Sequence, residues 1–227
     1  MQSSLEAVLN HPAVWRGNDC ARVAIPGVST GFSELDAALP GGGWPAAALT
    51  EIYSEHPGSG EMRLLMPACA RITGSGRWIA LIGAPYIPYA PALAAHGVNL
   101  SRLMLVRAEK PEERFWACEQ ALRYQDCGAV LAWFDHVPER AIKRLQLAAE
   151  AGNAIALLFR SARVIPASPA ALRLQVERSA DRTLVRVLKR RGSGLPTPIA
   201  IDLRDSPSIR STGPAPASFR RQLEIAS

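Results

Sequence analysis

The sequence lacks any apolar run close to the roughly 20 residues that a membrane-spanning helix needs. Its first residues, MQSSLEAVLNHPAVW, also lack the basic start and long apolar stretch of a secretory signal, so we expect a cytoplasmic protein with no membrane contact. The four cysteines show no C-x-x-C spacing. The absence of this spacing favours buried free thiols in a reducing compartment over metal ligation, and we expect no metal site.

Aromatic residues are scarce, at 6%, and Phe219 is the only one beyond Phe159. We therefore do not expect the C-terminal part to form a platform of aromatic side chains on which nucleic-acid bases stack. The net charge of +6 is uneven, because the chain from Glu139 onward has 16 Lys and Arg against seven Asp and Glu. Such a basic half favours contact with nucleic acid or with an acidic protein surface, and a solvated face is the alternative.

The length and composition indicate one globular domain, since 48% of the 227 residues are hydrophobic and 20% are charged. Short apolar runs alternate with helical segments, which predicts a three-layer α/β core with a mainly parallel sheet. The expected parallel strands are 49–53, 78–82, 103–106, 129–134 and 154–159. The expected helices are 61–72, 89–95, 111–124 and 138–151. We expect an N-terminal helix and arm over 1–24, the core over 25–204 and a tail over 205–227.

The pattern changes after Phe159. Segments 172–178, 183–189 and 197–203 are typical of antiparallel strands, which would form one edge of the sheet. The tail that follows is rich in Pro, Ser and Arg, and we expect it to be flexible and basic. Within it, Phe219 and Leu223 flank Arg220 and Arg221. This arrangement suits a short helix that folds on contact with a partner, and simple disorder is the alternative.

The most informative stretch runs from Gly27 to Met62. A helix-sized segment is followed by a Gly-Gly-Gly-Trp-Pro turn, a short strand and a glycine-bearing loop, an order that resembles the start of the RecA recombinase core. A working P-loop, G-x-x-x-x-G-K-[S/T], holds phosphates on backbone N–H groups and uses its Lys and hydroxyl for the outer phosphates and Mg²⁺. Here the glycines are Gly58 and Gly60, and Glu61 and Met62 take the Lys and hydroxyl positions. A carboxylate repels a triphosphate and a thioether is a poor Mg²⁺ ligand, so this is a degenerate Walker A loop.

Two further positions continue the resemblance. The run 128–135 is similar to a Walker B strand and ends in Asp135, for which capping of the following helix is the alternative role. The strand 78–82 leads to Pro85, where the resemblance to RecA implies the catalytic glutamate. Proline has no side chain that can orient water. We therefore expect no ATP hydrolysis, no bound cofactor and no enzymatic activity, with a residual DNA-dependent ATPase as a minor alternative.

Surfaces for partners are also implied by the resemblance. The segment 187–191 aligns with the part of RecA whose two basic residues reach the neighbouring subunit's nucleotide, and Lys189 and Arg191, with Arg190 between them, keep that charge. They can dock against a recombinase subunit or simply form a solvated hairpin tip. The two DNA-binding loops of RecA have little room here, although Arg160 and Arg163 could touch a phosphate, so any direct DNA contact is weak.

A RecA-like chain of this length with a Trp-Arg-Gly arm, lost ATP motifs and a basic tail resembles the ImuA family. That resemblance implies a role in SOS-induced translesion synthesis and mutagenesis, through contact with RecA and with ImuB, an inactive relative of Y-family polymerases. An error-prone C-family DNA polymerase would be an indirect partner. The middle of the chain, 77–159, also resembles SulA, an SOS cell-division inhibitor, which gives the alternative function.

Overall fold

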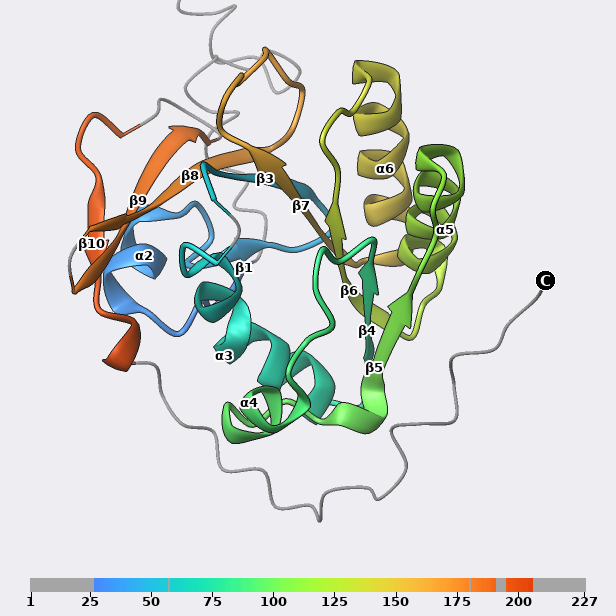
Figure 1. Cartoon of the computed structure of the whole chain (residues 1–227), viewed down its shortest axis with the longest axis horizontal. Helices are drawn as coiled ribbons and strands as arrows, with labels where there is room; N and C mark the ends of the chain where they lie inside the picture. Colours follow the sequence, from blue (N-terminus) through green and yellow to red (C-terminus); the bar gives the residue numbers. More distant parts are fainter. Residues whose placement is uncertain (1–26, 57, 180, 191–194, 206–227) are drawn as a thin grey trace, which may run out of the picture.

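An eight-stranded mixed sheet forms the centre of the protein (Figure 1). The structure, a computed structural model, describes residues 27–56, 58–179, 181–190 and 195–205. The sheet strands are β3 (Leu49–Ser54), β4 (Trp78–Ile82), β5 (Leu103–Val106), β6 (Cys127–Trp133), β7 (Ile155–Ser161), β8 (Leu172–Ser179), β9 (Arg182–Lys189) and β10 (Ile199–Ile201). Their order across the sheet is β10-β9-β8-β3-β7-β6-β4-β5. The expected arm over 1–24 lies outside the described residues, as does the tail beyond 205.

The strands from β8 to β5 are all parallel, which confirms the predicted α/β core with a mainly parallel sheet. The apolar side chains of β3, β4, β6, β7 and β8 are largely buried because helices and connecting segments cover both faces, whereas β5 at the end of the sheet is only partly buried. Strands β9 and β10 add the predicted antiparallel edge. One expectation needs correction, since β8 is antiparallel only to β9 and pairs in parallel with β3 on its other side.

Helices lie on both faces of the sheet (Figure 1). The described helices are α2 (Ser33–Ala38), α3 (Glu61–Gly74), α4 (Ala90–Ala95), α5 (Pro111–Arg123) and α6 (Glu139–Gly152). One core cluster joins α2, α3 and α4 to the face of β3 that carries Ile52, and a second joins α5 and α6 to the face that carries Leu49. Among the described helices, none has the length and apolar character needed to cross a membrane.

Close backbone approach fixes two parts of this arrangement. A Cβ atom on Gly152, at the end of α6, would lie 1.8 Å from the carbonyl oxygen of Leu122 on α5. A Cβ atom on Gly43 would lie 2.2 Å from the carbonyl oxygen of Val28. The expected Gly-Gly-Gly-Trp-Pro turn therefore continues into a two-residue strand, β2 (Trp44–Pro45), which pairs with β1 (Gly27–Val28).

A candidate cleft at the carboxyl ends of the strands

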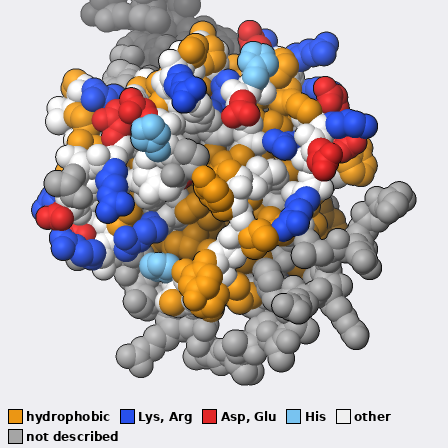
Figure 2. All heavy atoms as spheres, in the orientation of Figure 1, with side chains coloured by type: hydrophobic (Ala, Val, Ile, Leu, Met, Phe, Trp, Pro, Cys, Tyr) orange, Lys and Arg blue, Asp and Glu red, His pale blue; other side chains and the backbone are white. Residues whose placement is uncertain are grey.

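A cleft of about 1030 Å³ opens where β3, β4, β5, β6 and β7 end. Ligands of open α/β sheets bind at this edge, beyond the carboxyl ends of the strands. The lining comes from segments far apart in the sequence, including the β3–α3 loop, the β4–α4 segment and the segment after β7. Figure 2 shows apolar side chains gathered in the hollow of this face, with Lys and Arg side chains around it. The position of the cleft makes it the candidate functional site.

Two glycines shape the loop between β3 and α3. Gly58 has φ +92° and Gly60, the residue before α3, has φ +102°, a left-handed conformation that favours glycine. At Gly60 an added Cβ would also lie 2.8 Å from Leu203 Cδ1 and 2.9 Å from Thr183 Oγ1. The left-handed backbone and this close packing therefore favour glycine at position 60, independently of any ligand.

Glu61, at the position of the P-loop lysine, turns into the loop. The Gly58 N–H donates to Glu61 Oε1 at 2.6 Å, and the side chain is buried, with the residue only 4% exposed. A carboxylate in the first turn also interacts favourably with the positive end of the helix dipole. The loop thus holds a negative charge of its own. The second oxygen, Oε2, has no hydrogen-bond partner among the described residues.

The other predicted positions separate into two groups. Pro85 and Asp135 both line the cleft, Pro85 after β4 and Asp135 after β6. Met62 points elsewhere, because it packs against the core beneath α3. The alternative role for Asp135 as a helix cap is wrong, since α6 begins after Pro138 and has no side-chain cap.

The Tyr86-Ile-Pro-Tyr89 segment is exposed. Tyr86, Ile87 and Tyr89 are 73%, 68% and 73% exposed, so their side chains do not fill the space inside the loop. Tyr86 and Ile87 line the cleft. Across the cleft, Val164 in the β7–β8 segment is 75% exposed. Large apolar side chains therefore border the cleft from two sides.

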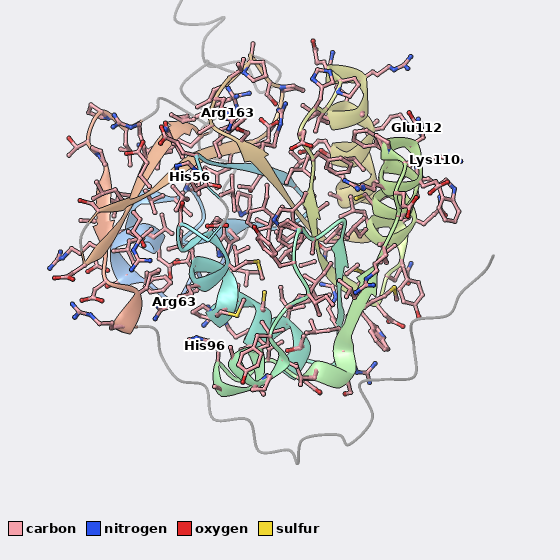
Figure 3. The ribbon with its side chains drawn as sticks, viewed as in Figure 1. His56, Arg63, His96, Lys110, Glu112 and Arg163 are labelled. Atoms are coloured by element: carbon pink, nitrogen blue, oxygen red, sulfur yellow. The ribbon has the colours of Figure 1, made fainter. Side chains whose placement is uncertain are left out.

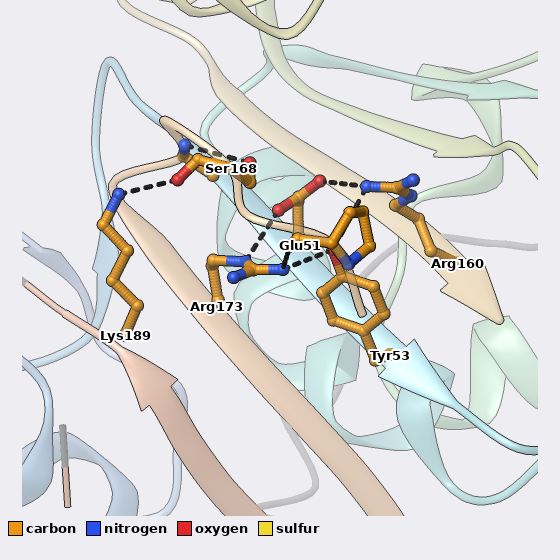
Figure 4. A network of polar contacts seen from close by, with 8 residues as sticks. Glu51, Tyr53, Arg160, Ser168, Arg173 and Lys189 are labelled. Atoms are coloured by element: carbon orange, nitrogen blue, oxygen red, sulfur yellow. Dashed lines mark hydrogen bonds and ion pairs between the residues drawn. The ribbon is translucent and has the colours of Figure 1, made fainter. Parts of the chain in front are cut away.

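A buried polar cluster lies beside the cleft (Figure 4). Glu51 on β3 accepts from Arg160 Nη1 at 2.6 Å and from Arg173 Nε at 3.0 Å, and it is fully buried. Both arginines also donate to the Tyr53 hydroxyl, at 3.1 and 2.8 Å. Burial raises the pKa of Tyr53, against the lowering effect of its hydrogen bond from Arg173. Two guanidinium groups share one carboxylate, so the cluster retains a positive charge.

No local sequence pattern predicts this cluster, and the sequence instead suggests that Arg160 could touch a phosphate. The structure instead commits Arg160 to Glu51 and Tyr53, with only 7% of the residue exposed. The available signal was Glu51 itself, a charged residue in a strand predicted to be buried. A buried charge requires a paired and hydrogen-bonded partner.

Two side-chain hydrogen bonds hold the segment between β7 and β8 in place. Arg173 Nη2 donates to the Pro166 carbonyl at 2.5 Å, and Lys189 Nζ donates to the Ser168 carbonyl at 2.9 Å. Lys189, predicted to reach a neighbouring subunit, therefore also stabilises its own fold.

Of the other residues predicted to bind partners, the structure describes only Arg190. Arg190 Nη1 donates to the Ala38 carbonyl at 2.6 Å. Arg191 is outside the described residues, as are the tail residues Phe219, Arg220, Arg221 and Leu223.

Other polar residues are spread over separate elements. His56 in the β3–α3 loop and His96 after α4 are far apart along the chain (Figure 3). Glu112 and Glu113 lie in the first turn of α5, as expected for carboxylates near the positive end of a helix. Cys69, Cys118 and Cys127 are buried free thiols, and Cys20 lies outside the described residues.

Comparison with known proteins agrees with the RecA-like architecture. The family described as the MT3502 N-terminal domain matches residues 37–146, just under half of the chain. A cell division inhibitor SulA from Edwardsiella piscicida is 35% identical over 99 residues, which cover 43% of this chain and 59% of SulA. A RecA protein from Marinobacter nauticus is 32% identical over 124 residues, which cover 53% of this chain and 35% of that RecA.

A RecA protein from Crocosphaera subtropica is 29% identical over 121 residues, again 53% of this chain and 34% of that RecA. The chain thus spans about a third of these RecA proteins and less than two thirds of SulA. These matches support a relationship to RecA- and SulA-like proteins.

Proposed function

We propose that this chain is a non-catalytic RecA-like accessory protein in SOS-induced translesion DNA synthesis. It would act as an adaptor between RecA and a complex of ImuB with an error-prone C-family polymerase. The observation that carries the proposal is Glu61, whose carboxylate accepts the Gly58 N–H inside the glycine loop. A loop that contains its own anion is a poor phosphate site. A RecA-like chain without a phosphate site is better suited to binding than to hydrolysis.

Pro85 and Met62 support the same conclusion. Pro85 lines the cleft without a side chain that can orient water, and Met62 packs into the core. The basic pair Lys189 and Arg191 supplies the proposed contact with a recombinase subunit. The tail residues Phe219, Arg220, Arg221 and Leu223 supply a second proposed contact, with the polymerase complex.

The first experiment measures association of the purified chain with RecA assembled on single-stranded DNA, by co-sedimentation. We expect binding that Lys189→Glu with Arg191→Glu weakens by about tenfold. Arg191→Glu alone is also needed, because it leaves the bond from Lys189 to Ser168 intact. The matched control is Lys110→Glu with Lys143→Glu, a double charge reversal at exposed positions of other elements. Equal binding by all variants would remove this contact from the proposal.

Cells provide the second test. Deletion of the gene should lower damage-induced mutation frequency, and a copy carrying the double reversal at Lys189 and Arg191 should fail to restore it. Full restoration by that copy would contradict the adaptor role of these residues.

The SulA match favours a second candidate function, inhibition of cell division. Overproduction of the chain should then produce filamentous cells without DNA damage. Normal division at high expression, together with RecA binding, would exclude this candidate.

A further inference from the structure

The apolar rim of the cleft is the surface feature that the loss of nucleotide chemistry leaves unexplained. Tyr86, Ile87 and Val164 are each about 70% exposed, although large apolar side chains normally avoid such exposure when they are clustered. Beneath them Trp133 stacks on Phe159, with ring centroids 4.5 Å apart, and both line the cleft. An apolar floor with an apolar rim is typical of a site that buries the side chain of a partner.

The rim is held in place on the Val164 side. Bonds from Arg173 to the Pro166 carbonyl and from Lys189 to the Ser168 carbonyl anchor the segment that carries Val164. Arg173 is itself fixed by Glu51. Because these bonds restrain the segment before any partner binds, less conformational entropy is lost on association.

The charges of the cleft discriminate between kinds of partner. Its lining contains four arginines, but also the carboxylates of Glu55, Glu61, Glu109 and Asp135. A nucleic-acid backbone would meet these carboxylates along its length, and the repulsion disfavours a polyanion. A protein segment with one acidic residue can avoid them.

Positive charge lies on the β7 side of the cleft, next to Val164, as well as at Arg107 and Arg114 near β5 and α5. Arg163, next to Val164, is exposed and makes no side-chain hydrogen bond or ion pair with a described residue. The buried cluster below adds positive charge, since Arg160 and Arg173 share the single carboxylate of Glu51. An acidic side chain is therefore favoured beside Val164.

We propose that the cleft binds a protein segment that sets a large apolar side chain against Ile87 and Val164 and an acidic side chain against Arg163. This inference rests on the proposed function in one respect, namely that the cleft receives protein rather than nucleotide. It adds the chemistry of the bound segment and the residues that select it.

The test uses the purified full chain and a phage-displayed library of random dodecapeptides, followed by fluorescence anisotropy with the enriched peptides. We expect enriched sequences to combine an aromatic or aliphatic residue with a nearby Asp or Glu. Ile87→Ser, Val164→Ser and Arg163→Glu should each weaken binding by about tenfold. The matched control is Leu147→Ser, at an equally apolar position on α6 that is 61% exposed and does not line the cleft.

A charge exchange makes the test specific. Changing the acidic residue of the peptide to Lys should abolish binding to the wild-type chain and restore it to Arg163→Glu. Enriched peptides that bind all cleft variants equally, or no enrichment at all, would overturn the proposal. So would binding of a fluorescent oligothymidylate that the same variants weaken, because the cleft would then be a nucleic-acid site. None of these outcomes bears on RecA association, which is measured separately, so the adaptor proposal can fail or stand independently.

Discussion

Glu51 and Arg160 form a buried ion pair across the parallel strands β3 and β7, with 2.6 Å between Oε1 and Nη1. Their side chains are 0% and 4% exposed. Arg173 approaches the same carboxylate from β8 on the other side. One carboxylate on the middle strand thus joins three neighbouring strands at the edge of the cleft.

Removing that carboxylate should leave two buried guanidinium groups without their anion. We expect Glu51→Gln to lower the free energy of unfolding by about 3–5 kcal/mol, the usual cost of breaking one side of a buried ion pair. Urea unfolding followed by circular dichroism measures the change. Glu139→Gln is the control, because it breaks an exposed pair with Lys143 and should leave the unfolding midpoint near that of the wild type. Similar losses in both variants would show that the cluster contributes little.

The two loop glycines should respond differently to substitution. Gly58→Ala and Gly60→Ala both place a Cβ in the left-handed region, which costs roughly 1 kcal/mol. Gly60→Ala also pushes against Thr183 and Leu203, whereas no described residue lies within 4 Å of a Cβ at position 58. We expect thermal unfolding to show a clearly larger loss for Gly60→Ala. Equal losses would mean that the loop and the β9 edge can separate without cost.

Nucleotide binding should return when the internal anion is replaced. Glu61→Lys with Met62→Thr restores the residue types that hold the outer phosphates and Mg²⁺. We expect the double variant to bind a fluorescent ATP analogue at least about tenfold more tightly than the wild type. Glu112→Lys, a charge reversal of the same kind at the start of α5, should not change binding. Tight ATP binding or Mg²⁺-dependent turnover by the wild type would contradict our assignment of Glu61.

The buried thiols should be chemically inert in the folded chain. Burial raises the pKa of both Cys69 and Cys118 to about 12, so very little thiolate exists at about pH 8. We expect iodoacetamide to label them roughly a thousandfold more slowly than in urea-unfolded chain, as measured by peptide mass spectrometry. Rapid labelling of the native protein would indicate that these helices open readily.

The parallel strands were predictable because each is a short apolar run with clear boundaries. Strands β4 and β5 begin and end where the sequence places them, at 78–82 and 103–106. Both have polar or glycine-containing segments beside them that cannot extend a buried strand. Local composition is sufficient where a short apolar run between polar or glycine-containing segments defines the element.

Pairing between distant segments was less predictable. The parallel contact of Glu51 with Arg173 joins residues 122 positions apart, and no local pattern specifies it. The pairing of Trp44 with Val28 was also missed, because glycines and a proline there indicate a turn rather than a strand. In the cleft, the sequence identified which residues replace the ATP-binding ones. The direction of the Glu61 side chain depends on the backbone of Gly58 and required the structure.

The place of β3 in the sheet has a consequence for synthesis of the chain. Its two neighbours are β7 and β8, whose residues follow it by more than 100 positions. Until the ribosome has released both, the apolar run from Leu49 to Tyr53 has no strand on either side. A nascent chain would expose this run for most of its synthesis, and contacts so distant in sequence form slowly. We therefore expect the newborn protein to depend on chaperones, and the segment at most risk before folding to be a strand that the finished fold buries completely except at Ser54.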